Sequence, residues 1–393
     1  MTELEITRMA HGGEGIAELD GRVVFVRGGY PGDVVRVAIT QEKKRFARAE
    51  VTSVVTAGPY RVPQACPAAA AGAGCCDFGD LDPEAETRLK ADILLSQLTR
   101  LGRVSEPPEP ELHALQPVRG WRTRVRLGVD KQGRAGFRAL GSHEIISVPC
   151  TQVAPGLLDG LLERTWTPGA EIVAVLDSTG ERHVVETRRA PRGRRVEKVS
   201  QVLEGSGTVT ERADDHTFHF PATAFWQAHS AAPDAYTGLI RSWLGDLAPA
   251  DNTVGWDLYG GVGLFVPALA DALGPEALIH SVDYSKAAAQ LSQESLADHR
   301  VETHNTMVEK AVGTLPAPRI VVLDPPRTGA GDDVVDGVAA QQPERVIHVG
   351  CDPATFSRDV AAWGNNGYRL TRLAVLNAFP GTHHFEVMAE LTR

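Results

Sequence analysis

Over the first 57 residues, hydrophobic and polar positions alternate in short runs rich in β-branched residues. Asp20-Gly21 lies between two apolar stretches, and a Pro-Gly-Asp turn at residues 31–33 precedes a further apolar run at residues 34–39. An Asp-Gly pair between such runs is typical of a hairpin, and several short strands at this spacing favour a small barrel. The pattern therefore predicts an OB-like β-barrel over residues 1–57.

The pattern is less regular from residue 58 to residue 214. Leucine and isoleucine recur at helical spacing over residues 84–101, which predicts a helix. After a Pro-rich linker at residues 107–110, shorter runs predict strands at residues 121–129, 135–140, 144–148, 181–188 and 196–203. The last two strands form an expected hairpin, and the whole segment is expected to be a central α+β domain.

From residue 215 to residue 393, short apolar runs alternate with amphipathic stretches. Apolar side chains on one helical face predict a helix over residues 226–247. The apolar runs predict strands at residues 254–259, 278–283, 319–324, 345–349, 369–376 and 385–391. This alternation predicts a mostly parallel, Rossmann-like α/β sheet with helices on both faces.

Charge restricts how such a protein could bind nucleic acid. The 393 residues include 40 Lys and Arg against 50 Asp and Glu, a formal net charge of −10 that excludes a uniformly basic surface. Two local patches suit phosphate contact, although each is otherwise a solvated edge or turn: Lys43, Lys44, Arg45 and Arg48 around Phe46, and Arg188, Arg189, Arg192, Arg194 and Arg195 at the expected hairpin tip. Without a secretion signal or a long apolar run, the sequence predicts a cytoplasmic protein with no membrane segment.

Five cysteines, unevenly spaced, argue against a disulfide framework. Cys66, Cys75 and Cys76 lie in an Ala/Gly-rich stretch, whereas Cys150 and Cys351 stand alone. We expect these thiols to be reactive, metal-binding or simply buried.

Glycines follow the strand expected at residues 254–259. The segment DLYGGVG at residues 257–263 includes Tyr259 and Gly261, and its backbone must pass close to any ligand at the carboxyl edge of the sheet. The next strand ends at Asp283, where a carboxylate can accept hydrogen bonds from ribose hydroxyls. The segment lacks the dinucleotide pattern GxGxxG and begins with an acidic residue, which favours S-adenosylmethionine over NAD. On their own, the glycines are equally compatible with a tight strand-to-helix connection.

Two further strand ends carry polar or reactive side chains to the same edge. One strand ends in Asp324, followed by a stiff Pro-Pro-Arg loop that suits contact with a methyl donor or a base. Another is followed by Cys351, just before an expected helix N-terminus, where the helix dipole and backbone amides favour a thiolate. We therefore expect Cys351 to be a nucleophile. The alternatives are a helix-capping Asp324 and a small, buried Cys351.

A loop before the last strand holds His383, His384 and, at the strand's start, Glu386. A thiolate, a base and a methyl donor together suit methylation of carbon 5 of uracil, because addition of the thiolate at carbon 6 makes carbon 5 nucleophilic. A base must then remove the proton from carbon 5 so that the cysteine can leave. Glu386 is the expected base, with His383 or His384 as alternatives.

These residues together resemble the RNA uracil-5-methyltransferase family with an N-terminal TRAM domain, along nearly the whole chain. The resemblance is carried by Gly12-Gly13-Glu14-Gly15, Phe25-Val26-Arg27, Gly136-Phe137-Arg138, Phe225-Trp226-Gln227, Gly350-Cys351-Asp352-Pro353-Ala354-Thr355 and His384-Phe385-Glu386. It implies a class I, S-adenosylmethionine-dependent enzyme in which Cys351 and Glu386 are catalytic. It also implies cofactor contacts from Gln227, Tyr259, Asp283, Asn305 and Asp324.

Many members of this family hold an iron–sulfur cluster on four cysteines, and this sequence departs from their pattern. Cys66 is followed by proline, and Cys150 is a distant fourth cysteine, as in the family. Between them, Cys75-Cys76 replaces a Cys-Gly-Gly-Cys element, and side chains of adjacent residues tend to diverge. The expectations are a [4Fe-4S] cluster, a zinc ion, or a remnant of packed thiols.

The resemblance implies a structured RNA as partner, tRNA or rRNA, from which the target base is turned out into the site. Neither DNA nor a membrane is expected as a partner, and we expect a monomer. Two other classes of function stay open. One is another nucleic-acid methyltransferase, directed at cytosine carbon 5 or an amino group, and the other is an RNA-binding or folding factor without turnover.

Overall fold

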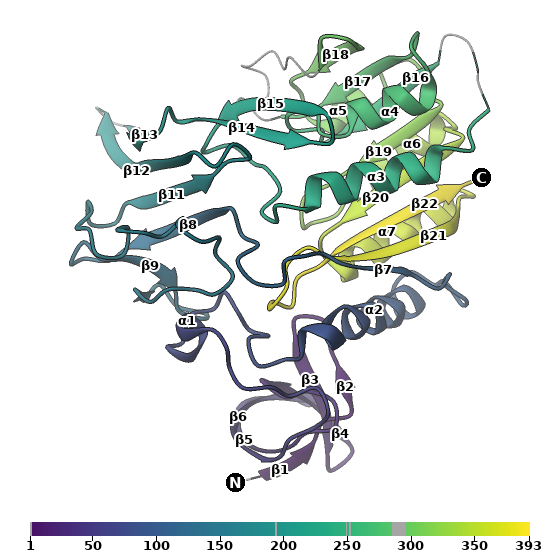
Figure 1. Ribbon diagram of the computed structural model, residues 1–393. Coiled ribbons are helices and arrows are strands. Elements are labelled where there is room, and N and C mark those ends of the chain that lie inside the picture. Colours follow the sequence, from purple (N-terminus) through teal and green to yellow (C-terminus); the bar gives the residue numbers. More distant parts are fainter. Residues whose placement is uncertain (1, 193–194, 249, 251–252, 285–295) are drawn as a thin grey trace.

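The computed structural model describes the chain except residues 1, 193–194, 249, 251–252 and 285–295. Three large sheets follow one another along the chain (Figure 1). The N-terminal sheet lies at one end of the molecule, and the central and C-terminal sheets extend from it side by side. Among the described residues, the search for a helix long and apolar enough to span a bilayer gives none.

The N-terminal sheet is strongly curled, which confirms the predicted barrel-like domain. Its order is β1-β5-β6-β4-β3-β2. The strands are β1 (Thr2–Glu5), β2 (Arg8–Met9), β3 (Glu14–Leu19), β4 (Arg22–Arg27), β5 (Val34–Glu42) and β6 (Phe46–Thr56). Asp20 and Gly21 both have positive φ, as the two-residue hairpin between β3 and β4 requires. Alternate valines and alanines of β4, β5 and β6 fill the interior.

The central sheet is antiparallel, in the order β10-β9-β8-β11-β12-β13. Its strands are β8 (Arg124–Val129), β9 (Ala135–Arg138), β10 (Ile145–Ile146), β11 (Glu171–Leu176), β12 (Arg182–Arg192) and β13 (Arg195–Glu204). The expected hairpin is present as β12 and β13, and its strands are longer than predicted. A separate hydrophobic core on this sheet includes three of the cysteines, Cys66, Cys76 and Cys150.

The C-terminal sheet has eight strands in the order β18-β17-β16-β19-β20-β22-β21-β7. They are β16 (Val254–Leu258), β17 (Leu278–Val282), β18 (Arg300–His304), β19 (Ile320–Leu323), β20 (Arg345–Gly350), β21 (Arg369–Asn377), β22 (Glu386–Thr392) and β7 (Glu111–Ala114). The five strands from β18 to β20 are parallel, and all but the edge strand β18 are mostly apolar, as in sheets covered on both faces. The covering helices are α3 (Ala232–Leu244), α4 (Val266–Leu273), α5 (Val308–Ala311), α6 (Asp332–Ala340) and α7 (Pro353–Asn365).

Three features cross the expected domain division, whose boundaries lie after residue 57 and after residue 214. The helix predicted at residues 84–101 is α2 (Pro83–Arg100), and it packs against α7 and β21 of the C-terminal sheet. The unpredicted strand β7 pairs with β21, so the segment from α2 to β7 belongs to that sheet. The hairpin of β14 (Thr208–Ala213) and β15 (His216–Pro221) spans the boundary expected at residue 214. The short helix α1 (Pro67–Ala70) stays with the central sheet.

The helix predicted at residues 226–247 begins later, at Ala232. Pro233 occupies its first turn, a position that proline favours. The preceding residues form a loop instead, because their backbone pairs with the segment before β8: Thr123 N donates to Ala228 O at 2.9 Å. Residues 224–228 of this loop lie beside the residues that follow β16, β19 and β20, at the carboxyl ends of the parallel strands.

Candidate active site

A cavity of about 630 Å³ opens at the carboxyl ends of β16, β19 and β20. It lies where the strand order reverses, with β17 and β18 on one side of β16 and β19 and β20 on the other, which is where open α/β sheets bind ligands. Its volume suits a molecule of cofactor size together with part of a second ligand. Residues predicted from sequence line it: Gln227, Tyr259, Gly261, Asp283, Asp324, Cys351, His384 and Glu386.

The glycine turn after β16 is built around a buried carboxylate. A Cβ on Gly260 would lie 2.2 Å from Asp257 Oδ2, so only glycine fits there. Asp257 Oδ2 accepts a hydrogen bond from Ser281 Oγ at 2.9 Å, while Oδ1 is buried without a partner among the described residues. Gly261, at φ +58°, donates its amide to Asp283 Oδ2 at 3.1 Å. The turn thus brings backbone and the Asp283 carboxylate to the cavity edge, with the Asp257 carboxyl group buried behind it, an arrangement that fits a nucleoside with ribose hydroxyls.

Two carboxyl groups near this edge have pKa values close to neutral pH. Burial, with contributions from Asp283 and Asp324, raises the pKa of Asp257 to about 7. Burial also raises the pKa of Asp324 to about 7. Because a nearby cation favours the ionised form of both groups, such a cavity favours a positively charged ligand.

Cys351 lies between the end of β20 and the start of α7, as predicted. The expectation of a thiolate there was wrong, because burial first, then Glu386 and Asp324, raise the pKa of the thiol to about 12. The amides of the first helical turn do not favour the thiolate, since Asp352 Oδ1 already accepts from the amides of Ala354 and Thr355, at 3.0 and 2.9 Å. Arg327 opposes the shift only in part.

Asp352 also links the N-terminal sheet to this loop. Its Oδ2 lies 3.2 Å from Nε2 of His11, a residue between β2 and β3. The loop that carries Cys351 is therefore held from two sides, by its own helix and by the curled sheet.

Glu386 is the first residue of β22, a strand that lies between β20 and β21. The register pairs Gly350 with Val387, which brings Glu386 beside the end of the strand that precedes Cys351. Its side chain is buried, and Oε2 has no hydrogen-bond partner among the described residues. Burial and the neighbouring Asp324 raise the pKa of Glu386 well above its usual range. An unpaired buried carboxyl oxygen is costly, so its retention here favours a role toward a ligand.

The two histidines before Glu386 have different surroundings. His384 lines the cavity, with Nε2 3.3 Å from Arg327 Nη2, and burial lowers the pKa of its ring to about 3. His383 instead bonds through Nδ1 to the carboxylate of Asp77, and its backbone amide donates to Asp77 Oδ1 at 3.1 Å. Of the pair, His384 is thus the one placed at the cavity.

Two aromatic side chains on the cavity wall are largely exposed. Phe225 is 75% and Tyr284 72% accessible to solvent, whereas neighbouring Gln227 is buried. Tyr284 was not singled out from the sequence, although its place directly after Asp283 was a usable signal. Asn305 is exposed after β18 and is not among the residues that line this cavity.

The basic patches are only partly free to meet phosphates. In the first patch, Arg48 forms an ion pair with Glu14 at 2.7 Å and lies over the Phe25 ring. Arg45 and Phe46 line a groove of about 610 Å³ between the curled sheet and α2. In the second patch, Arg188 and Arg189 are exposed; the side chains of Arg192, Arg194 and Arg195 lie outside the described part of the structure.

The remaining cysteines gather away from the cavity in what we call the four-thiol site: Cys66, Cys75, Cys76 and Cys150. Sγ of Cys150 lies 3.7 Å from that of Cys66, 3.8 Å from that of Cys75 and 3.2 Å from that of Cys76. The adjacent pair does not diverge, since the sulfurs of Cys75 and Cys76 are 3.8 Å apart.

A ligand cavity at the switch point of a parallel sheet, with a glycine turn and acidic strand ends, defines a class I methyltransferase domain. Two family models match the chain: "TRAM domain" over residues 2–52 and "tRNA (Uracil-5-)-methyltransferase" over residues 290–393. An RNA methyltransferase of Corynebacterium efficiens is 55% identical and covers 99% of this chain and 94% of its own. One of Streptomyces coelicolor is 35% identical, covering 99% and 92%.

A solved structure is similar over the same extent. The tRNA (uracil-54, C5)-methyltransferase of Pyrococcus abyssi, in complex with S-adenosyl-L-homocysteine, superposes with a TM-score of 0.73 at 20% identity, covering 99% of each chain. The chain therefore belongs to the TRAM-containing family of S-adenosylmethionine-dependent RNA (uracil-5-)-methyltransferases.

Proposed function

We propose that the protein methylates carbon 5 of a uridine in tRNA or rRNA through a covalent adduct between Cys351 Sγ and carbon 6 of the ring. The observation that carries this proposal is the cavity itself, which is lined by one thiol and by one buried carboxyl group whose Oε2 has no hydrogen-bond partner among the described residues. Bound S-adenosylmethionine supplies the methyl group and a sulfonium charge.

The proposed chemistry has two parts. Cys351 Sγ gives its proton to solvent water as it bonds to carbon 6, and the electron pair of the ring double bond moves to carbon 5. There it takes the methyl group from the sulfonium sulfur, and the donor leaves as its neutral thioether. Glu386, ionised once the positive charge of the cofactor is in the site, then takes the proton from carbon 5, the carbon–sulfur bond breaks, and the ring double bond is restored. The released thiolate is free to take up a proton again.

The electrostatics of the cavity link these steps to ligand binding. With its pKa at about 12, the Cys351 thiol is protonated in the free protein, because burial first and then Glu386 and Asp324 disfavour the thiolate. A positive charge in the cavity opposes that effect, and Arg327 acts in the same direction. We therefore propose that the nucleophile is activated only in the assembled site.

Glu386 suits the role of base better than His384. Its pKa lies well above the usual carboxyl range, so the ionised form binds a proton strongly. The pKa of His384, about 3, makes that ring a weak base. We propose that His384 instead contributes to the shape of the cavity wall, together with Arg327.

We propose that a structured RNA presents the uridine as a flipped base. Exposed Phe225 and Tyr284 are suited to stack with bases at the cavity mouth. The groove that Arg45 and Phe46 line, between the curled sheet and α2, suits a strand of the same RNA. With an overall charge of −10, binding is expected to depend on these local contacts and to weaken with salt. A monomeric, cytoplasmic enzyme is the proposed form.

The proposal is tested by methyl transfer to bulk RNA, with the modified nucleoside identified by mass. The expected product is 5-methyluridine, and RNA containing 5-fluorouridine is expected to remain attached to Cys351 under denaturing conditions. A product other than 5-methyluridine contradicts the assigned reaction. Turnover on uridine without any trapped species contradicts the covalent step, and the unchanged chain with the cofactor omitted is the matched control.

A further inference from the structure

We propose that the four-thiol site holds a single tetrahedral zinc ion, in place of the iron–sulfur cluster that the family resemblance implies. Zinc bonded to four thiolates at about 2.3 Å sets neighbouring sulfurs about 3.8 Å apart. Three of the sulfur–sulfur distances, 3.7, 3.8 and 3.8 Å, agree with this geometry, and the fourth, between Cys76 and Cys150, is shorter at 3.2 Å.

The same distances do not fit a [4Fe-4S] cluster. In that cluster each cysteine binds a different iron, so the whole core of four irons and four sulfides lies between the cysteine sulfurs. Sulfurs in mutual contact leave no room for such a core.

The covalent alternative does not fit either. A disulfide requires sulfurs about 2.05 Å apart, whereas the nearest pair here, Cys76 and Cys150, is 3.2 Å apart and all five cysteines are free. Three of the four thiols are buried, and the fourth, Cys75, is partly so. Bringing them together from three separate segments without a bond among them is explained by an ion that binds all four.

The site lies next to the loop that leads into Glu386. We call residues 378–385, between β21 and β22, the base loop. Asp77, which follows Cys76, bonds to His383, and the Phe78 amide donates to Gly381 O at 3.1 Å. The ion would therefore fix one chain segment that grips the base loop.

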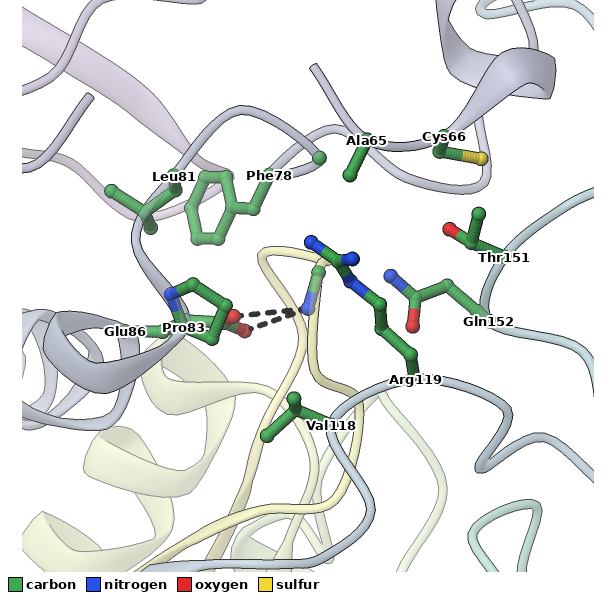
Figure 2. A pocket seen from close by; sticks show the side chains of 12 residues that line it. Ala65, Cys66, Phe78, Leu81, Pro83, Glu86, Val118, Arg119, Thr151 and Gln152 are labelled. Atoms are coloured by element: carbon green, nitrogen blue, oxygen red, sulfur yellow. Dashed lines mark hydrogen bonds between the residues drawn. The ribbon is translucent and has the colours of Figure 1, made fainter. Parts of the chain in front are cut away.

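A second segment grips the same loop from the side of Cys150. Trp121 Nε1 donates both to Gln152 Oε1 at 2.7 Å and to Pro380 O at 3.1 Å. A Cβ on Gly381 would lie 2.1 Å from Gln152 Nε2, so the contact is tight. Figure 2 shows Gln152 and Phe78 on opposite sides of this loop, with Glu86 accepting from the Gly381 amide at 3.0 and 3.1 Å. Zinc thus acts as a positioning element for the base loop, without contacting substrate.

The zinc assignment is tested by metal content, independently of methyl transfer. The full chain is purified without oxygen, and zinc, iron and acid-labile sulfide are measured per chain, together with the visible spectrum. One zinc per chain and a colourless protein are expected. Substitution Cys76→Ser is expected to lower the zinc content about tenfold or more, whereas Cys351→Ser, the matched cysteine control, retains it.

Iron with sulfide and broad visible absorption overturns the assignment, as does iron without sulfide. A metal-free protein whose four thiols react with a disulfide reagent in the native state also overturns it. The positioning role has its own readout, because removal of zinc with a chelator is expected to speed amide exchange in the base loop more than in β16–β17. Equal exchange with and without zinc contradicts that role. The metal analysis does not depend on methyl transfer, so the zinc assignment can hold even if the methylation proposal fails.

Discussion

The chain contains two different sulfur environments, one at the cavity and one within the core of the central sheet. Cys351 stands alone at a cavity among carboxyl groups, and its pKa is raised first by burial and then by Glu386 and Asp324. The four-thiol site contains sulfurs in mutual contact and lies within an apolar core. The two proposed roles, nucleophile and metal ligand, correspond to different neighbours: carboxyl groups around Cys351 and other thiols around Cys150.

The largest effect is expected from removing the lone sulfur. Cys351→Ala should lower methyl transfer by roughly 10³-fold or more, because no other side chain can add to carbon 6. Zinc content and thermal stability should be unchanged, since the four-thiol site lies in another core. Methylation assays and metal analysis on the same preparation check both. Retained activity would show that Cys351 is not the nucleophile.

The next effect concerns the release of that sulfur. Glu386→Gln should reduce turnover by about 10²–10⁴-fold, because the proton on carbon 5 is no longer removed. Methylated RNA should then accumulate covalently bound to Cys351, visible as a slow band in a denaturing gel. His384→Gln is the matched variant in the same cavity. If it, rather than the Glu386 variant, accumulates the adduct, the roles assigned to the two side chains are reversed.

The protonation of Cys351 can be measured directly by alkylation. A thiol with a pKa of about 12 should react with iodoacetamide roughly 100-fold more slowly at pH 7 than a cysteine of ordinary pKa. Because only the thiolate reacts, the rate should rise with pH through the alkaline range, and Glu386→Gln should raise it at a given pH. Peptide mass mapping of the alkylated site measures these rates. A rate that levels off near pH 7 would contradict the raised pKa.

The smallest effect is expected where the two sulfur regions are connected. Asp77→Asn weakens the bond to His383, and a looser base loop should lower kcat about tenfold with little change in KM for RNA. Zinc content should be retained. Asp92→Asn, on the exposed side of α2, is the control and should leave both unchanged. Loss of zinc in the Asp77 variant would indicate a role in the metal site instead.

Local pattern was sufficient to predict much of this molecule. Continuous apolar runs identified the parallel strands, and the residues that end them, Asp283, Asp324 and Cys351, lie at one edge because parallel strands share their direction. The Asp-Gly turn predicted its hairpin for a similarly local reason. The predictions of the curled sheet and of the class I sheet were therefore confirmed.

What the sequence missed depends on contacts between distant segments. The pKa of Cys351 was misjudged because Glu386 lies 35 positions away and the dominant effect is burial. Strand β7 is short and follows a Pro-rich linker, so only its pairing with β21 identifies it. Likewise, the convergence of Cys75 and Cys76 on Cys150 follows from the packing of three segments, which spacing alone does not reveal.

The pairing of β7 with β21 has a consequence for the order of folding. Helix α2 and strand β7 leave the ribosome more than two hundred residues before β21 does. Until β21 is made, the surfaces of α2 and β7 that pack against it have no partner. Only the arrival of β21 and β22 closes the gap beside β20, and that event also delivers Glu386. Completion of the sheet and completion of the proposed catalytic pair therefore coincide in synthesis, and we expect a nascent chain lacking these strands not to modify RNA.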